Sequence, residues 1–308
     1  MEITRRELMA GGIAAAGGMV GRPSLAGLLR AKGIPVRIGA TDWNLRQEAS
    51  PSALELGKRI GFQGVQVSLT DRRNQSEPPR LKNLAEAAAH REEARKQGVA
   101  ISSTCLNILH INYLKSDKLG QKWVADSIPV TKTMETKVIL LPFFGNGRFT
   151  NRQEMAYVAD FLKEIGPEAH KAGVILGLED TVSAEDNMFM VDRAKSPAVK
   201  VYYDTGNSTV NGFDVVKEIR WLGKDNICEI HIKDNPNYLG QGKIDFPAVV
   251  DAIADIGFKQ WCVLETDSPT RDVEYDMGKN LRYITDLFAT RAAEDEIKHK
   301  RRANPWDG

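Results

Sequence analysis

The sequence predicts a single α/β domain folded as a closed (β/α)₈ barrel. From about residue 34 to residue 290, short apolar runs alternate with longer stretches at helical spacing, and the alternation occurs eight times. Continuously apolar strands between helices indicate a parallel sheet whose outer face is covered. Eight such units match the size of a closed barrel better than an open doubly wound sheet. The absence of a Gly-x-Gly-x-x-Gly motif after the first strand also argues against a dinucleotide-binding fold.

Each predicted strand is a short run rich in apolar and β-branched residues. The eight runs are Val36–Ala40, Gly64–Leu69, Ala100–Leu106, Lys137–Leu141, Val174–Leu178, Val199–Tyr203, Ile227–Ile232 and Gln260–Leu264. Leu81–Gln97 is typical of the helices between them, because its apolar residues keep roughly helical spacing before a stop at Gly98. A glycine that could take the left-handed turn before the next strand stands in four units, at Gly61, Gly98, Gly173 and Gly257.

The first 33 residues differ from the rest and are interpreted as an export signal and linker. Arg5 and Arg6 precede a mildly apolar Gly/Ala-rich run, Met9–Val20, which is too short and weak to span a bilayer. This arrangement resembles a twin-arginine signal, and the small residues around Ala26 suggest cleavage after it. We therefore expect a periplasmic or otherwise exported protein with no membrane span once the signal is removed. A frayed amphipathic helix and an uncleaved anchor are the alternatives.

At the other end, residues 291–308 are charged on every side, so we expect the solvated end of the last helix followed by disorder. The domain organisation is then a signal and linker over 1–33, the barrel over 34–290 and this tail. The 42 basic and 41 acidic residues leave a net charge of +1, which provides no field for collecting nucleic acid or anionic lipid. The pattern leaves a homo-oligomer open.

Three cysteines occur, all within apolar strand-like runs: Cys105, Cys228 and Cys262. An odd number of thiols in such positions indicates buried small hydrophobes and no disulfide framework.

Ionisable residues mark the ends of four consecutive predicted strands. Glu179 follows the fifth strand, Asp204 the sixth and Glu265 the eighth, and His231 alternates within the seventh. Each is separated from the next by about one βα unit, and catalytic groups of a (β/α)₈ barrel gather at the carboxyl ends of its strands. The four side chains should therefore lie side by side.

Three carboxylates and one imidazole placed together would repel and lose hydration unless a cation compensates them. An oxygen-rich set with one nitrogen suits Mn²⁺, Mg²⁺ or Co²⁺ better than structural Zn²⁺. These residue types alone support metal-assisted proton abstraction or hydrolysis. The alternative is that each residue caps a helix or joins a salt bridge at the barrel mouth, although capping favours Asp, Asn, Ser and Thr over Glu and His.

Together with Thr41-Asp42-Trp43 after the first strand and Leu239–Phe246 after the seventh, these residues carry a family resemblance. Residues 34 to 290 resemble the xylose-isomerase-like barrel superfamily, in the branch of sugar phosphate isomerases and epimerases. That branch includes ketose 3-epimerases, hydroxypyruvate isomerases and inosose dehydratases.

The resemblance implies an enzyme with one divalent metal, Mn²⁺ first and Mg²⁺, Co²⁺ or Zn²⁺ as alternatives. Its ligands here would be Glu179, Asp204, His231 and Glu265. The resemblance also implies isomerisation or epimerisation of a keto sugar or polyol through an enediolate, with Glu179 and Glu265 as the acid/base pair. Asp204 and His231 would be the fixed ligands.

The chain departs from ketose epimerases of that family at three places. Asn207 stands where they carry His, residues 235–238 contain no arginine where they carry Arg, and Gln66 replaces a frequent Glu. These changes remove charge from the substrate pocket, which argues against a simple ketose 3-epimerase. Together with export, the missing arginines favour unphosphorylated sugars or oxidised glycosides as substrates.

We expect six further residues near the predicted strand ends to contact the substrate: Trp43, Gln66, Asn107, His110, Asn207 and Lys233. Lys233 could polarise a substrate oxygen, or it could pair with Asp234 or Asp267 as scaffolding at the rim.

Three alternatives remain beside the isomerase. A keto-sugar dehydratase would begin with the same proton abstraction, and a non-catalytic carbohydrate-binding barrel would keep the metal for structure. An endonuclease IV-like nuclease is less well supported, since such enzymes use a histidine-rich multinuclear site and this chain has five histidines, of which His231 alone is well placed.

Overall fold

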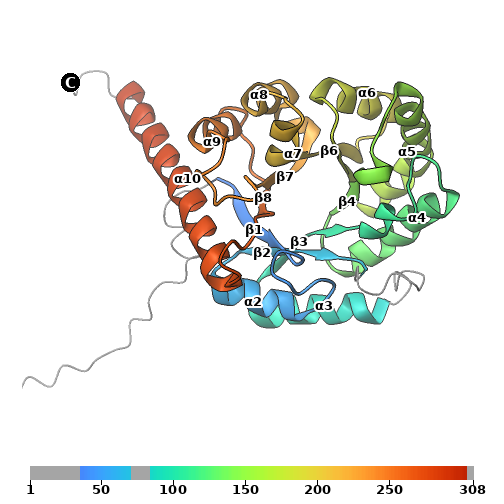
Figure 1. Ribbon diagram of the computed structural model, residues 1–308, viewed down its shortest axis with the longest axis horizontal. Coiled ribbons are helices and arrows are strands. Elements are labelled where there is room, and N and C mark those ends of the chain that lie inside the picture. The colour runs from blue at the N-terminus through green and yellow to red at the C-terminus, as the bar shows by residue number, and fades with distance from the viewer. Residues whose placement is uncertain (1–34, 71–83, 304–308) are drawn as a thin grey trace, which may run out of the picture.

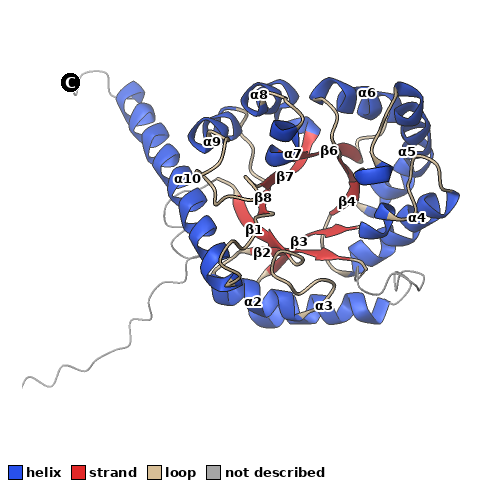
Figure 2. Ribbon diagram, in the orientation of Figure 1, coloured by secondary structure: helices blue, strands red, loops and turns tan. Residues whose placement is uncertain are grey.

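The structure, a computed structural model, describes residues 35–70 and 84–303 of the 308-residue chain. Eight parallel strands form a closed barrel in sequential order, and helices surround it (Figures 1 and 2). The predicted (β/α)₈ fold is confirmed. The predicted export segment and the first three residues of the expected helix Leu81–Gln97 lie outside the described residues. Within the described part, no helix is both long enough and apolar enough to cross a bilayer.

The strands agree with the predicted ones to within one or two residues at each end. They are β1 Arg37–Thr41, β2 Gly64–Ser68, β3 Ala100–Cys105, β4 Val138–Pro142, β5 Ile175–Glu179, β6 Val199–Asp204, β7 Ile227–Ile232 and β8 Trp261–Leu264. The helices are α2 Ser52–Ile60, α3 Leu84–Gln97, α4 Lys118–Thr133, α5 Arg152–Ala172, α6 Ala184–Ala194, α7 Thr205–Val210, α8 Val215–Asn226, α9 Phe246–Asp255 and α10 Val273–Ala303, with short 3₁₀ turns η4 Asn107–His110 and η5 Gly145–Gly147.

Two periodicities build the layers. Along β7, Ile230 and Ile232 face outward and are fully buried in the main apolar core between the barrel and its helices. Glu229 and His231 alternate with them, so their side chains face the barrel interior, where both are buried. The interior of this barrel is therefore partly polar, and its polar groups must find partners there.

Local sequence signals define the helix ends. Side-chain caps accept the first free backbone N–H groups of α5, α6 and α8 at Asn151, Ser183 and Asp214. The four predicted stop glycines all have left-handed backbone angles, with φ of 113° at Gly61, 64° at Gly98, 74° at Gly173 and 67° at Gly257. These turns are confirmed, and they direct the chain from each helix back to the next strand.

The last helix extends into the charged tail. α10 continues without a break through residues 291–303 and runs along the outside of the barrel beside α9 (Figure 1). Arg291 holds it there, because its guanidinium lies 2.6 Å from Asp251 and 2.8 Å from Asp255. Residues 291–303 are therefore the end of the last helix, as expected, and the expected disorder beyond it falls on residues 304–308, which lie outside the described residues. The three cysteines are buried and free, as predicted.

A pair of glycine variants tests the backbone argument. Gly173→Ala adds a methyl group that meets no atom within 4 Å, so its effect reports the left-handed φ alone. It should lower the free energy of unfolding by about 1–2 kcal/mol. Gly278→Ala lies inside α10 with ordinary contacts and should raise stability by up to about 1 kcal/mol. Urea unfolding measures both. Equal changes in unfolding free energy for the two variants would contradict the conclusion that the left-handed backbone at Gly173 requires glycine.

Candidate metal centre

Four side chains from consecutive strands converge at the carboxyl-terminal rim of the barrel. Glu179 ends β5, Asp204 ends β6, His231 lies in β7 and Glu265 directly follows β8. The parallel register pairs Asp204 with His231, and one ligand atom from each residue lies within 4.8 Å of the others. The juxtaposition expected from the spacing of the four residues is present in the structure. All but the partly accessible Glu265 are buried.

The Nδ1 atom of His231 lies at the centre of the group. It is 2.8 Å from Glu179 Oε1, 3.3 Å from Glu265 Oε2 and 3.5 Å from Asp204 Oδ2. Asp204 has a divided role: its Oδ1 accepts the Asn207 backbone N–H at 2.7 Å and caps α7. Its Oδ2 is buried and faces the acidic cluster, with the ammonium of Lys233 at 2.9 Å. A buried acceptor aimed into an acidic cluster is the kind of atom that a metal cation satisfies.

Lys233 supplies a positive charge at the edge of the cluster. Its Nζ lies 2.6 Å from Glu265 Oε2 and 2.9 Å from Asp204 Oδ2. The aliphatic part of the Lys233 side chain packs against Gly206. A Cβ at that position would lie 2.5 Å from Lys233 Cγ, so a glycine is needed there. The alternative pairing of Lys233 with Asp234 or Asp267 is wrong. Asp234 instead accepts the backbone N–H groups of Gly242 and Lys243, which fixes the loop after β7.

The electrostatics of the two glutamates differ. Burial raises the pKa of Glu179 to about 8, and His231 only partly opposes this effect. Burial would also raise the pKa of Glu265, but Lys233 and His231 hold it well below its usual range. Burial disfavours the charged imidazole, yet Glu179 and Glu265 raise the pKa of His231 well above its usual value. The cluster thus holds protons and an ammonium group as counter-charges, and a divalent cation would compete with them.

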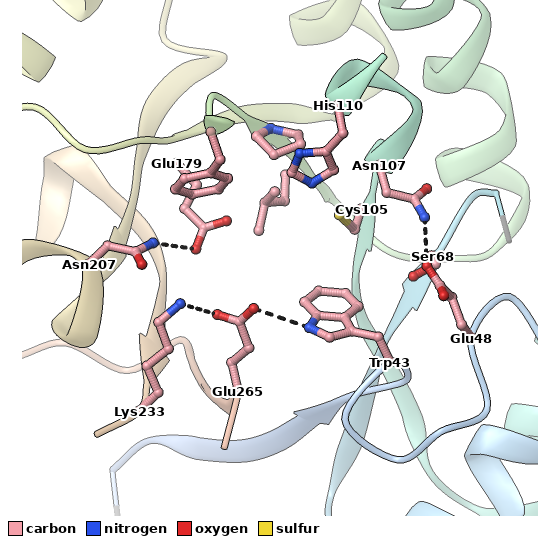
Figure 3. Close-up of a pocket in the computed structure, with 13 residues that line it drawn as sticks. Trp43, Glu48, Ser68, Cys105, Asn107, His110, Glu179, Asn207, Lys233 and Glu265 are labelled. Carbon is pink, nitrogen blue, oxygen red and sulfur yellow. Dashed lines mark hydrogen bonds and ion pairs between the residues drawn. The ribbon is translucent and has the colours of Figure 1, made fainter. Parts of the chain in front are cut away.

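A cavity of about 240 Å³ opens above this cluster (Figure 3). The carboxylates of Glu179 and Glu265 turn toward its common space, as Figure 3 shows. The lining residues are Trp43, Glu48, Ser68, Cys105, Asn107, His110, Leu140, Pro142, Phe144, Glu179, Asn207, Lys233 and Glu265. Five of the six residues expected to contact a substrate are among them.

Besides Lys233, two of the five lie beside the cluster. Trp43 donates its indole N–H to Glu265 Oε1 at 3.1 Å and meets the His231 ring edge-on, with centroids 6.1 Å apart. Asn207 places its side-chain amide 3.5 Å from Glu179 Oε1. Both therefore help to orient a glutamate as well as lining the cavity.

Two others line the far wall. Asn107 donates to Glu48 Oε1 at 2.9 Å, and the His110 ring stacks on Phe144 with centroids 6.0 Å apart.

Gln66 is the exception among the expected substrate contacts. It does not line the cavity, because it is fully buried beneath His231, with its Oε1 2.8 Å from His231 Nε2. The sequence placed Gln66 on the correct strand, but its side chain lies deeper in the barrel than the cavity where it was expected. Gln66 lies two residues before the end of β2 and so contacts the ring from below.

Glu48 and Phe144 were not anticipated as cavity residues. Glu48 lies in the loop between β1 and α2, and that loop is held by Asp42, whose carboxylate accepts Ser68 N at 2.7 Å and Ala49 N at 2.9 Å. Burial raises the pKa of Asp42 to about 7. A charged residue in a long loop carries no periodic signal, so the position of Glu48 follows from the Asp42 contacts and from its hydrogen bond with Asn107.

The comparisons with known proteins agree on the fold. A family model described as "Xylose isomerase-like TIM barrel" matches residues 54–287. A 2-epi-5-epi-valiolone 7-phosphate 2-epimerase from an Actinoplanes species is 23% identical over 207 residues, which cover 65% of this chain and 73% of that protein.

Solved structures of sugar epimerases are also similar. A D-psicose 3-epimerase, solved in the presence of D-fructose, has a TM-score of 0.68 at 14% identity, covering 82% of this chain and all of its own. An L-ribulose 3-epimerase has a TM-score of 0.68 at 19% identity, covering 84% and 97%. A 3-keto-D-glucoside 4-epimerase from E. coli has a TM-score of 0.64 at 15% identity, covering 81% and 98%. At these identities the likeness is one of fold.

Replacing Lys233 tests whether the cluster depends on counter-charge. Lys233→Met removes the ammonium from the buried Asp204 and the partly accessible Glu265, so the metal-free protein should lose about 2–4 kcal/mol of unfolding free energy. Added Mn²⁺ should restore more stability to this variant than to the wild type. Lys115→Met is the matched control, since Lys115 is similarly buried but pairs with a single carboxylate, Glu154. An equal loss in both variants would contradict the argument.

Proposed function

Because this chain belongs to the xylose isomerase-like TIM barrel family, we propose that it is a divalent-metal-dependent isomerase or epimerase of a keto sugar or polyol. The observation that carries the proposal is the set of four ligand atoms within 4.8 Å of one another at the floor of a cavity. The relative found by sequence and the similar solved structures are sugar epimerases, which supports an enzymatic function for this chain.

The residues present fit a single divalent cation. Glu179, Asp204 and Glu265 each supply an oxygen and His231 supplies Nδ1, a set that suits Mn²⁺ and also Mg²⁺ or Co²⁺. Asp204 Oδ2 supports this fit, because it is buried facing the other ligand atoms, and the Lys233 ammonium at 2.9 Å occupies a position that a cation would compete for. Of these ions we propose Mn²⁺.

In this proposal the two glutamates carry the proton. They extend from β5 and β8 into one cavity, so they can approach a bound carbon from different sides. One takes the proton next to the carbonyl and the other returns a proton, which inverts that centre or moves the carbonyl. The metal, when bound, would polarise the substrate's carbonyl and neighbouring hydroxyl oxygens and favour an enediolate. Trp43 and Asn207 hold Glu265 and Glu179 in position.

The charges that line the cavity support a substrate without phosphate. Lys233 is the one Lys or Arg side chain among the described lining residues, and two carboxylates already hold it. Glu48 adds negative charge at the far wall. A phosphate group binds best where arginines or lysines converge on it. We therefore propose an unphosphorylated keto sugar or an oxidised glycoside.

Solvent deuterium exchange tests this function. Incubation of Mn²⁺-loaded enzyme with unphosphorylated ketopentoses and ketohexoses in D₂O should give an isomeric product carrying deuterium next to the carbonyl. Glu179→Gln and Glu265→Gln should each lower turnover by about 10²–10⁴-fold, because each removes one proton carrier. Glu218→Gln is the control, since Glu218 binds Tyr203 and Ala184 outside the cavity and should leave turnover unchanged.

Other outcomes separate the alternatives. Loss of water from the sugar, with the same dependence on the two glutamates, would assign a dehydratase. Sugar and metal binding without exchange of any carbon-bound proton would assign a non-catalytic carbohydrate-binding barrel. Faster turnover of D-fructose 6-phosphate than of D-fructose would overturn the unphosphorylated substrate.

We also propose that residues 1–33 direct export by the twin-arginine route. The double variant Arg5→Lys/Arg6→Lys should leave the full chain in the cytoplasm of a bacterial host, as fractionation and blotting would show. Arg22→Lys/Arg30→Lys is the control, because it makes the same change outside the arginine pair. Unchanged export of the first variant would contradict the proposal.

A further inference from the structure

A chain of buried hydrogen bonds runs down the barrel interior beneath the candidate metal centre. It begins at His231 Nε2, which lies 2.8 Å from Gln66 Oε1. The Gln66 amide nitrogen then lies 3.0 Å from Ser103 Oγ and 3.1 Å from Tyr202 OH. These two hydroxyls converge on Glu229 Oε2, at 2.7 Å and 3.0 Å respectively. All five side chains are at most 1% exposed.

The carboxylate at the lower end determines which group donates and which accepts in each of these hydrogen bonds. As a carboxylate, Glu229 Oε2 only accepts hydrogen bonds, so Ser103 and Tyr202 each donate their single hydroxyl hydrogen to it. The two hydroxyl oxygens can then only accept from the next group. The Gln66 NH₂ meets that need, because it has two hydrogens and faces two acceptors. Glu229 therefore decides which way round the Gln66 amide lies.

The orientation of Gln66 then determines the imidazole of His231. With its NH₂ directed at Ser103 and Tyr202, Gln66 presents its carbonyl oxygen to His231 Nε2. A carbonyl oxygen only accepts, so Nε2 must bear a hydrogen. The lone pair of the neutral ring is consequently on Nδ1, the atom at the centre of the acidic cluster.

We propose that Glu229 is a positioning residue that makes His231 Nδ1 a metal ligand, acting through Ser103, Tyr202 and Gln66. The inference rests on the proposed metal-dependent function. Glu229 itself makes no contact with the cavity and is not among its lining residues. Partners of a ligating histidine commonly set its tautomer and ring orientation, and their loss costs roughly 10–100-fold in metal affinity.

Two variants remove the groups that fix donor and acceptor in this series of hydrogen bonds. Glu229→Leu deletes the acceptor at similar volume, which frees Ser103 and Tyr202 to donate upward and lets the Gln66 amide turn. Ser103→Ala/Tyr202→Phe deletes two oxygen atoms and leaves the barrel shape nearly unchanged, so it serves if the first variant folds poorly. Both should weaken Mn²⁺ binding, measured by calorimetry, by roughly 10–100-fold.

Two controls separate positioning from general stability. Glu229→Gln keeps a side-chain oxygen that can accept both hydroxyl hydrogens, so it should restore Mn²⁺ affinity to within about threefold of wild type. Glu218→Leu removes a glutamate that accepts from Tyr203 and from the Ala184 backbone but has no link to Gln66. It should lower the melting temperature without weakening Mn²⁺ binding.

A second readout does not need metal. Long-range ¹H–¹⁵N correlation spectra of the metal-free protein, with His231 assigned through His231→Asn, report which ring nitrogens bear hydrogen. In the wild type Nε2 should be protonated whether the ring is neutral or cationic. In Glu229→Leu the Nε2 hydrogen should be lost or shared with Nδ1, and in Glu229→Gln it should persist.

The outcomes are distinguishable from those of the proposed function. If the wild type binds no Mn²⁺, the metal-dependent function fails, while the spectra still test the tautomer. If the wild type binds Mn²⁺ and Glu229→Leu binds it equally well with Nε2 protonated, the positioning role is overturned and the function stands. An equal loss of affinity in Glu218→Leu would also overturn the positioning role.

Discussion

The structure depends on one unfavourable interaction, the mutual repulsion of Glu179, Asp204 and Glu265 around a single imidazole nitrogen. Their ligand atoms lie within 4.8 Å at a site largely removed from water, where three like charges cannot persist without compensation. In the described structure His231 and Lys233 provide it, through contacts of 2.6 to 3.5 Å. The fold holds the carboxylates in place regardless, because each is attached to the end of a different strand of a closed barrel.

The attachment of each clustered residue to its own strand explains which features of the fold and the site the sequence could predict. The barrel and the four clustered residues follow from periodicity and from spacing by one βα unit, and both are insensitive to errors of a residue at a strand end. The glycines that end four helices could also be predicted, because a left-handed backbone angle at a helix end strongly favours glycine.

What the sequence did not reveal depends on contacts between distant residues. Gln66 was expected at the cavity, but its height on β2 places it beneath His231. Lys233 was expected either to polarise a substrate oxygen or to pair with Asp234 or Asp267, and the sequence did not show that it contacts Asp204 and Glu265, with its stem packed on Gly206. Arg291 on α10 pairs with Asp251 and Asp255 on α9, which also lie far from it in the sequence. None of these contacts leaves a periodic signal along the chain.

The neutral side chain at position 66 follows from the charge inside the barrel. A glutamate there could accept from His231 Nε2, but it could not donate to Ser103 and Tyr202, whose hydrogens are already given to Glu229. It would also bury a second carboxylate close to Glu229, beneath a site that already holds three. Glutamine supplies an acceptor to His231 and two donors to Ser103 and Tyr202 without charge. The neutral Gln66 and the buried Glu229 on β7 are thus complementary, because the residue between Glu229 and His231 links the two without adding a second buried charge.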